Sequence, residues 1–142
     1  MQHVFVYGSL LFPEIVEGLT GRKFEAQDAT LQNYVRRAVK NNDYPAVVPF
    51  EGEQVSGKIL LNVDMRSLEA LRFFEGDEYA CVDIKVKVNS EEITACIFVW
   101  TGDAGALEKG DWDPHIFERK ALADYVRYVV PETVNDFERL FS

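Results

Sequence analysis

The sequence predicts an α+β protein in which the strands form a strongly curled sheet or a small barrel. Five segments have the β-branched, aromatic or alternating composition of strands, and only a few segments of helical spacing lie among them. Hydrophobic residues make up 47% of the chain, with ten Phe, six Tyr and two Trp, which is enough apolar surface for a core. Since the chain has 142 residues and no linker rich in Pro, Ser or Gly, we expect residues 1–142 to form a single domain.

The N-terminal third predicts two strands and a short helix. HVFVYG, residues 3–8, is apolar on both faces, as in a strand covered on both sides. PEIVEGLTG, residues 13–21, begins with Pro and ends with Gly, which indicates one or two helical turns. ATLQNYVRRAVK, residues 29–40, predicts the second strand, and NNDYPAVVPFEG, residues 41–52, predicts a loop because of its two prolines and its Asn/Asp cluster.

The remaining strands include a hairpin. In residues 79–88 the aliphatic side chains alternate with the rest, so Tyr79 and Cys81 are expected on the face opposite the aliphatic one. NSEE, residues 89–92, is the expected turn of the hairpin. The predicted strands are 55–63, 79–88 and 93–100.

Two helices are expected near the C-terminus, and both are interpreted as packing elements. Asp113 and Pro114 have the character of an N-cap and a first helical residue. Pro131 is expected to interrupt this helix and to begin a second one over residues 131–141. The first helix carries an apolar stripe of Phe117, Ala121, Tyr125 and Val129.

Charge and composition argue against several classes of function. Fifteen Lys and Arg stand against twenty-four Asp and Glu, a net charge of −9, which repels nucleic acids and anionic membrane surfaces. No apolar run approaches the roughly 20 residues of a membrane helix, and no secretory signal pattern is visible. We therefore expect a cytoplasmic protein that binds neither nucleic acid nor membrane; the oligomeric state has no signal in the sequence.

Metal ligation is not expected. Cys81 and Cys96 are too far apart for a CxxC site and are interpreted as reduced, structural thiols. His3 and His115 are isolated from other ligand-type residues.

Gly8 and Ser9 end the first strand, and two interpretations stay open. The first is an ordinary tight turn that returns Leu10 and Leu11 to the core. The second is a place where the backbone approaches a ligand, because glycine has no Cβ and tolerates positive φ. Backbone N–H groups exposed at such a bend can together hold a developing negative charge.

Glu75 is the most informative side chain of the middle region. Asp64 caps a predicted helix, Leu68 and Leu71 face its apolar side, and Glu75 falls on that same side near the end set by Gly76. The negative end of the helix dipole and partial burial both raise the pKa of a carboxyl group there. Glu75 is therefore a candidate general base, and the alternative is a helix-end glutamate turned toward solvent.

The two features VYGSLL and LEALRFFEGDEY together resemble the γ-glutamylcyclotransferase-like superfamily. NYVRRAVKNNDYPAVVP, VSGKILLNV and DWDPHIFERKALADYV are similar to the branch of the plant avirulence-induced proteins and their bacterial relatives, so the resemblance spans nearly the whole chain. It implies a compact, partly closed β-barrel with flanking helices. It also implies cofactor-free and metal-free release of 5-oxoproline from a small γ-glutamyl compound.

The resemblance assigns roles to individual residues. Glu75 matches the family's base, the backbone of Tyr7 to Leu10 matches its donor loop, and Tyr79 matches an aromatic position after the base. The implied substrate-binding residues are Tyr7, Gly8, Ser9, Leu10 and Tyr79.

The sequence departs from the family pattern at Cys81, where relatives commonly carry Arg. The loss of a guanidinium removes a bidentate anchor, which Arg36 or Arg37 could replace. The competing hypothesis is therefore a non-catalytic small-ligand or protein-interaction module that keeps the same pocket.

Overall fold

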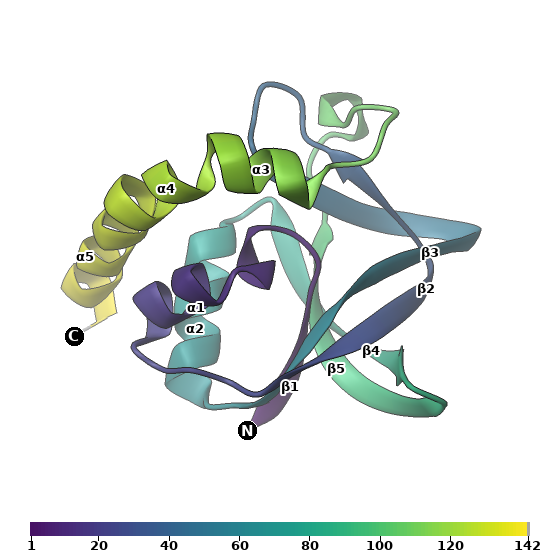
Figure 1. Ribbon diagram of the computed structural model, residues 1–142, viewed down its shortest axis with the longest axis horizontal. Coiled ribbons are helices and arrows are strands. Elements are labelled where there is room, and N and C mark those ends of the chain that lie inside the picture. The colour runs from purple at the N-terminus through teal and green to yellow at the C-terminus, as the bar shows by residue number, and fades with distance from the viewer. Residues whose placement is uncertain (142) are drawn as a thin grey trace.

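The computed structural model describes residues 1–141, and its strands form a closed barrel in the order β1-β3-β2-β4-β5. Neighbouring strands are antiparallel except β1 and β5, which close the barrel in parallel (Figure 1). The α+β class and the curled, mostly antiparallel barrel predicted from the sequence are confirmed. The strands are β1 (Gln2–Val6), β2 (Ala26–Ala38), β3 (Pro45–Val63), β4 (Tyr79–Val88) and β5 (Glu91–Trp100).

Strand β3 is much longer than predicted, and the expected loop over residues 41–52 is wrong from Pro45 onward. Pro45 begins the strand opposite Ala38, a position where a missing N–H is tolerated. Pro49 lies next to an irregularity in the β2–β3 register, between Gln32 and Tyr34. The buried side chains that follow Pro45 hold this segment in the sheet, so the prolines mark its start and its irregularity and not a loop.

Helices α1 and α2 share one buried apolar cluster with residues of β1 and β3 on one side of the barrel, and the C-terminal helices extend beyond them (Figure 1). Helix α2 begins after Asp64, whose carboxylate accepts a hydrogen bond from the Ser67 N–H at 3.2 Å, and ends at Gly76 with φ of 87°. The helices are α1 (Pro13–Thr20), α2 (Met65–Glu75), α3 (Pro114–Lys120), α4 (Leu122–Asp124) and α5 (Val130–Phe141), with 3₁₀ turns η1 (Ser9–Leu11) and η2 (Ala104–Ala106).

The break in the C-terminal helices falls at Ala121, not at Pro131 as predicted. Ala121 leaves helical geometry with φ of −127° and ψ of −27°. The chain then runs without a break through a π-helical turn, η3 (Tyr125–Val129), into α5. In this turn the Val130 N–H donates to the Tyr125 carbonyl, five residues back, so the wider turn accommodates a proline that has no N–H to donate.

The two cysteines form a disulfide, so the prediction of reduced thiols is wrong. Cys81 of β4 and Cys96 of β5 lie with their Cα atoms 5.9 Å apart. The hairpin register pairs Cys81 with Phe98 and Asp83 with Cys96, which sets the cysteines diagonally opposite each other. The cysteines are 15 positions apart, so the sequence alone does not show that the strand register brings them together. Disulfides are rare in cytosolic proteins, so this bond argues against a cytoplasmic location. That location stays a prediction.

The apolar residues form two main clusters, one inside the barrel and one between the barrel and the helices. Tyr7 belongs to the barrel cluster, whereas Leu10, three residues later, belongs to the helix cluster. The segment after β1 therefore crosses from one cluster to the other.

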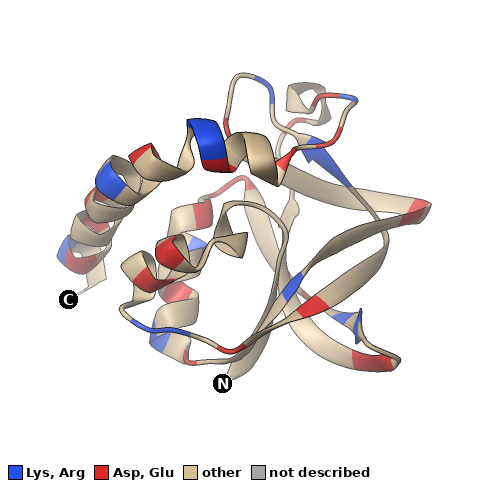
Figure 2. Cartoon of the chain, in the orientation of Figure 1, with Lys and Arg blue, Asp and Glu red and all other residues tan. Residues whose placement is uncertain are grey.

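Acidic and basic residues are interspersed along helices, loops and strands (Figure 2). Over residues 1–141, no helix is both long enough and apolar enough to cross a bilayer.

Candidate functional site

Glu75 and the segment after β1 meet in one cleft. We call residues Tyr7–Leu10 the donor loop and this space the narrow cleft. Glu75 reaches it from the last turn of α2, and the start of β3 forms another wall. The structure thus brings Glu75 together with four of the five predicted binding residues. The cleft is lined by Phe5, Val6, Tyr7, Gly8, Ser9, Leu10, Tyr44, Pro45, Glu75 and Phe98.

The donor loop is a buried backbone turn. The Leu11 N–H donates to the Gly8 carbonyl at 2.9 Å, and the Phe12 N–H donates to the Ser9 carbonyl at 3.2 Å. The first N–H groups of such a turn have no acceptor within the turn itself. The N–H groups of Gly8, Ser9 and Leu10 are therefore the ones that a ligand in the cleft can use.

Gly8 is needed for close approach and not for a left-handed turn. Its φ is −130°, so the positive φ considered from the sequence does not occur. A Cβ at this position would lie 2.7 Å and 2.8 Å from Cγ and Cδ of Pro45. The glycine thus lets the donor loop pack directly against the start of β3.

Glu75 lies on the apolar side of α2, as the helical spacing predicted. Leu68 and Leu71 of the same face are buried in the core, and Glu75 itself is partly buried. Removal from water raises the pKa of the Glu75 carboxyl group from 4.5 to about 8. Desolvation is thus the cause of the raised pKa, and the helix dipole, which the sequence also suggests, is not among its causes.

Two tyrosine hydroxyls are held by backbone carbonyls beside Glu75. Tyr7 donates to the Phe98 carbonyl at 2.5 Å, and Tyr79 donates to the Pro45 carbonyl at 2.8 Å. Burial, followed by the nearby Glu75 charge, raises the pKa of both phenols well above 10. Both phenols therefore stay protonated as donors, and Tyr79 fixes the strand start that packs on Gly8.

A second cavity of about 190 Å³ adjoins Glu75, and we call it the tyrosine cavity. Tyr79, the remaining predicted binding residue, lies here and not in the narrow cleft. The π-helical turn and α5 supply one wall of it. Tyr125 belongs to an apolar stripe whose spacing indicates packing, so no local pattern in the sequence marks it as a cavity residue. Its lining is Ser9, Tyr44, Phe74, Glu75, Tyr79, Tyr125, Val129 and Thr133.

The tyrosine cavity is aromatic, and carboxylates lie around it. Burial raises the pKa of the Tyr125 phenol to about 12, with smaller contributions from Asp43, Tyr44 and Glu75. Burial, Glu78 and Glu75 likewise raise the pKa of Tyr44. Its lining residues include no Lys or Arg.

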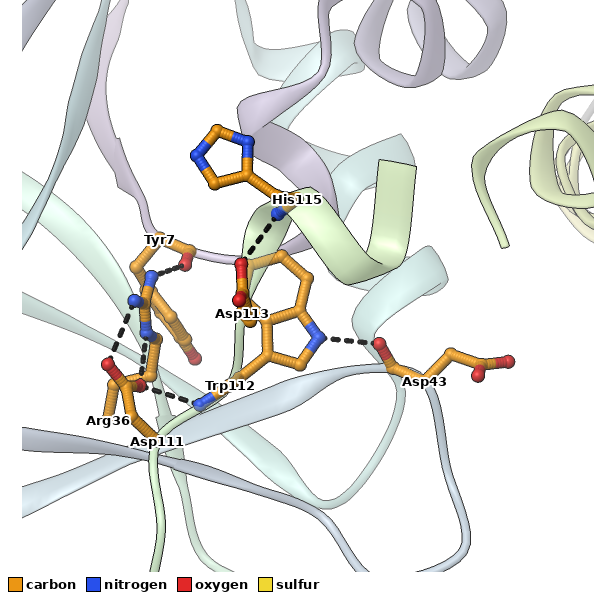
Figure 3. A network of polar contacts seen from close by, with 7 residues as sticks. All are labelled: Tyr7, Arg36, Asp43, Asp111, Trp112, Asp113 and His115. Atoms are coloured by element: carbon orange, nitrogen blue, oxygen red, sulfur yellow. Dashed lines mark hydrogen bonds and ion pairs between the residues drawn. The ribbon is translucent and has the colours of Figure 1, made fainter. Parts of the chain in front are cut away.

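Arg36 and Arg37, considered as replacements for the arginine missing at position 81, do not line either cavity. Arg36 approaches the donor loop from behind and donates from Nη1 to the Tyr7 carbonyl at 2.8 Å (Figure 3). Arg37 instead donates to the Lys109 carbonyl. Within residues 1–141, no group of three or more His, Cys, Asp or Glu is arranged to hold a metal ion.

The site combines a proton acceptor with backbone donors. Glu75 offers a carboxylate whose pKa is shifted toward neutrality, the state in which a general base is effective. The donor loop offers N–H groups that can stabilise negative charge on a carbonyl oxygen. Both line the same cleft, whose volume of about 10 Å³ admits only a small group such as a carbonyl oxygen, and Glu75 and Ser9 also line the adjoining cavity of about 190 Å³.

Comparisons with known proteins agree with this fold. The family described as "Gamma-glutamyl cyclotransferase, AIG2-like" matches residues 4–114. AIG2-like protein A of Arabidopsis thaliana is 34% identical over 115 residues, covering 80% of this chain and 70% of that protein.

Solved structures give the same result. The solution structure of an Arabidopsis thaliana protein is 30% identical, with a TM-score of 0.69 over 90% of this chain and 87% of the other. A structure described as "Gamma-glutamyl cyclotransferase" shares the fold with a TM-score of 0.58 at 20% identity, covering 75% of this chain and 68% of that one.

Proposed function

The chain belongs to the AIG2-like gamma-glutamyl cyclotransferase family, and on this basis we propose that it is an enzyme that releases 5-oxoproline from a small γ-glutamyl compound. The observation that carries the proposal is the position of Glu75 in the same cleft as the donor loop. Base and donors on opposite sides of one carbonyl are what an intramolecular acyl transfer needs.

In the proposed reaction the substrate's α-amine attacks its own γ-carbonyl. Glu75 removes a proton from the α-ammonium group, and the freed amine forms the new C–N bond of the five-membered ring. The carbonyl oxygen becomes an oxyanion, which accepts hydrogen bonds from backbone N–H groups of the donor loop.

Collapse of this intermediate breaks the original γ-amide C–N bond. The proton held by Glu75 passes to the departing nitrogen. The ring nitrogen then gives its remaining extra proton to the freed Glu75 carboxylate, which releases it to the amine product. The products are 5-oxoproline and a protonated amine, with no change of oxidation state. Ser9 acts through its backbone and not as a nucleophile, because no histidine lines either cavity to activate its hydroxyl.

The test is chromatographic detection of 5-oxoproline across γ-glutamyl dipeptides, γ-glutamylamines and glutathione. We expect release from at least one class, and we expect Glu75→Gln to lower turnover by about 10²–10⁴-fold while ligand still binds. Gln keeps the size and hydrogen-bonding reach of Glu but is not a base.

Glu78→Gln is the matched control, because Glu78 is exposed and lines neither cavity. Its turnover is expected to stay within twofold of the wild type. Ligand binding without release of 5-oxoproline from any compound would instead support the non-catalytic module. Equal turnover of the wild type and Glu75→Gln would show that Glu75 is not the base.

A further inference from the structure

Arg36 lies directly behind the donor loop, outside both cavities. It projects from β2, its side chain is only 14% exposed, and its Nη1 donates to the Tyr7 carbonyl at 2.8 Å. Figure 3 shows the guanidinium group between this carbonyl and Asp111. A nearly buried charge that contacts the backbone of a candidate site calls for a functional explanation.

The guanidinium is fixed in one orientation. Its Nε donates to Asp111 Oδ1 at 2.7 Å and its Nη2 donates to Asp111 Oδ2 at 3.1 Å, a bidentate pair. The Trp112 ring lies 5.4 Å from the guanidinium carbon. With one edge paired to Asp111, Arg36 directs Nη1 at the Tyr7 carbonyl.

The Tyr7 carbonyl and the Gly8 N–H belong to the same peptide group. Resonance couples the two, so a charged donor on the oxygen draws electron density from the nitrogen and makes the N–H a stronger donor. We propose that Arg36 is a positioning residue that orients and polarises the Tyr7–Gly8 peptide, so that the Gly8 N–H stabilises the oxyanion of the reaction. This proposal rests on the proposed function.

The same network also holds the opposite wall of the narrow cleft. The Trp112 indole Nε1–H donates to the Asp43 carbonyl at 2.6 Å, and the Trp112 backbone N–H donates to Asp111 Oδ1 at 2.7 Å. Asp43 is followed by Tyr44 and Pro45, which line the cleft. The segment around Asp111 and Trp112 therefore connects both sides of the site, and Arg36 is its link to the donor loop.

The first experiment compares steady-state kinetics of Arg36→Met and Arg36→Lys with the wild type. Removal of a full oxyanion donor costs about 10²–10³-fold in kcat, so weakening one is expected to lower kcat by about 10–100-fold. The expected KM change is less than about threefold, because Arg36 does not line the cleft. Arg36→Lys keeps the charge but loses the bidentate pair with Asp111, so its kcat should be intermediate.

Arg37→Met is the matched control, because Arg37 is the next residue on β2 and does not contact Tyr7. Its kcat should stay within twofold of the wild type. An unchanged kcat in Arg36→Met, or an effect on KM alone, would overturn the proposal.

The second experiment needs no substrate. In a ¹⁵N-labelled protein the Gly8 amide proton should move upfield in Arg36→Met, because a less polarised N–H is more shielded, while Arg37→Met should leave it in place. An unmoved Gly8 resonance in a folded Arg36→Met protein overturns the proposal. Absence of 5-oxoproline in the wild type defeats the proposed function instead, and the Gly8 shift still decides whether Arg36 polarises the peptide.

Discussion

The two cavities that meet at Glu75 differ in where their walls come from. The narrow cleft is built from the donor loop, the start of β3 and the end of α2, all within the part of the chain that matches the family. The tyrosine cavity takes Tyr125, Val129 and Thr133 from C-terminal helices beyond residue 114, where that match ends. Under the proposed function, the reacting carbonyl would enter the cleft, and the tyrosine cavity, which Glu75 and Ser9 also line, would hold the rest of the substrate.

The largest effect is expected from pH, which acts on Glu75, the residue that the two cavities share. Since burial raises the pKa of Glu75 to about 8, the base is mostly protonated below that pH, and kcat/KM should fall about tenfold per pH unit. The decrease from pH 8 to pH 6 is about 50-fold, because half of Glu75 is ionised at its pKa, and it is measured as initial rates of 5-oxoproline release. Residual activity of Glu75→Gln should lack this inflection; the same inflection in that variant would assign it to another group.

The raised pKa has a matching effect on stability. Unfolded Glu75 loses its proton near pH 4.5, whereas folded Glu75 keeps it up to about pH 8. The folded state therefore binds more protons in this window, and its stability falls as pH rises from about 4.5 to 8. Urea unfolding should show Glu75→Gln to be more stable than the wild type at pH 8, with the difference disappearing near pH 4. A difference that does not change with pH would contradict the raised pKa.

Gly8→Ala tests the close packing of the donor loop. A Cβ at Gly8 would lie 2.7 Å from Pro45 Cγ, so we expect a loss of stability of about 1–3 kcal/mol and turnover lowered by about tenfold. Gly110→Ala is the control, because an added Cβ there meets nothing within 4 Å. The denaturant midpoint and the turnover are measured on the same variants. Wild-type values of both in Gly8→Ala would support the interpretation of the donor loop as an ordinary tight turn.

Tyr125→Ala tests the tyrosine cavity. Enlarging its wall removes contacts with the part of the substrate remote from the reacting carbonyl, so KM should rise by up to about tenfold while kcat changes less than threefold. Tyr128→Ala, which alters a 57% exposed side chain of the same π-helical turn, should leave both constants unchanged. A large loss of kcat with KM unchanged would instead place Tyr125 in the chemistry.

Reduction of the disulfide should have the smallest effect on turnover. The bond joins residues 15 apart, and a loop of that size stabilises the folded state by about 3 kcal/mol in the chain-entropy account. Dithiothreitol should therefore lower the urea midpoint but leave turnover within twofold, since neither cysteine lines either cavity. A Cys81→Ala/Cys96→Ala variant should be insensitive to the reductant. Equal midpoints with and without reductant in the wild type would contradict the expectation.

Local patterns were sufficient for helix α2 and for the two central parts of the site, but not for the start of β3 or the break in the C-terminal helices. Asp64, the leucine spacing and Gly76 define α2 and place Glu75 on its apolar side, because capping and helical periodicity act within a few residues. An apolar strand ending in glycine likewise indicated the donor loop, although its φ and the need to pack on Pro45 were not visible.

Sequence patterns alone predicted helix α2, the acidic charge, the family resemblance, and Glu75 and the donor loop as the central pair of the site. Long-range packing was needed to show that Pro45 begins a strand, that the cysteines pair across a hairpin, that Tyr125 lines a cavity and that Arg36 binds the donor loop. The physical reason is range: caps, periodicity and turn chemistry depend on near neighbours, whereas strand register and helix packing join residues far apart in the chain. Arg36 and Tyr7 are separated by 29 positions, and no local pattern in the sequence indicates that the Arg36 side chain contacts the Tyr7 carbonyl.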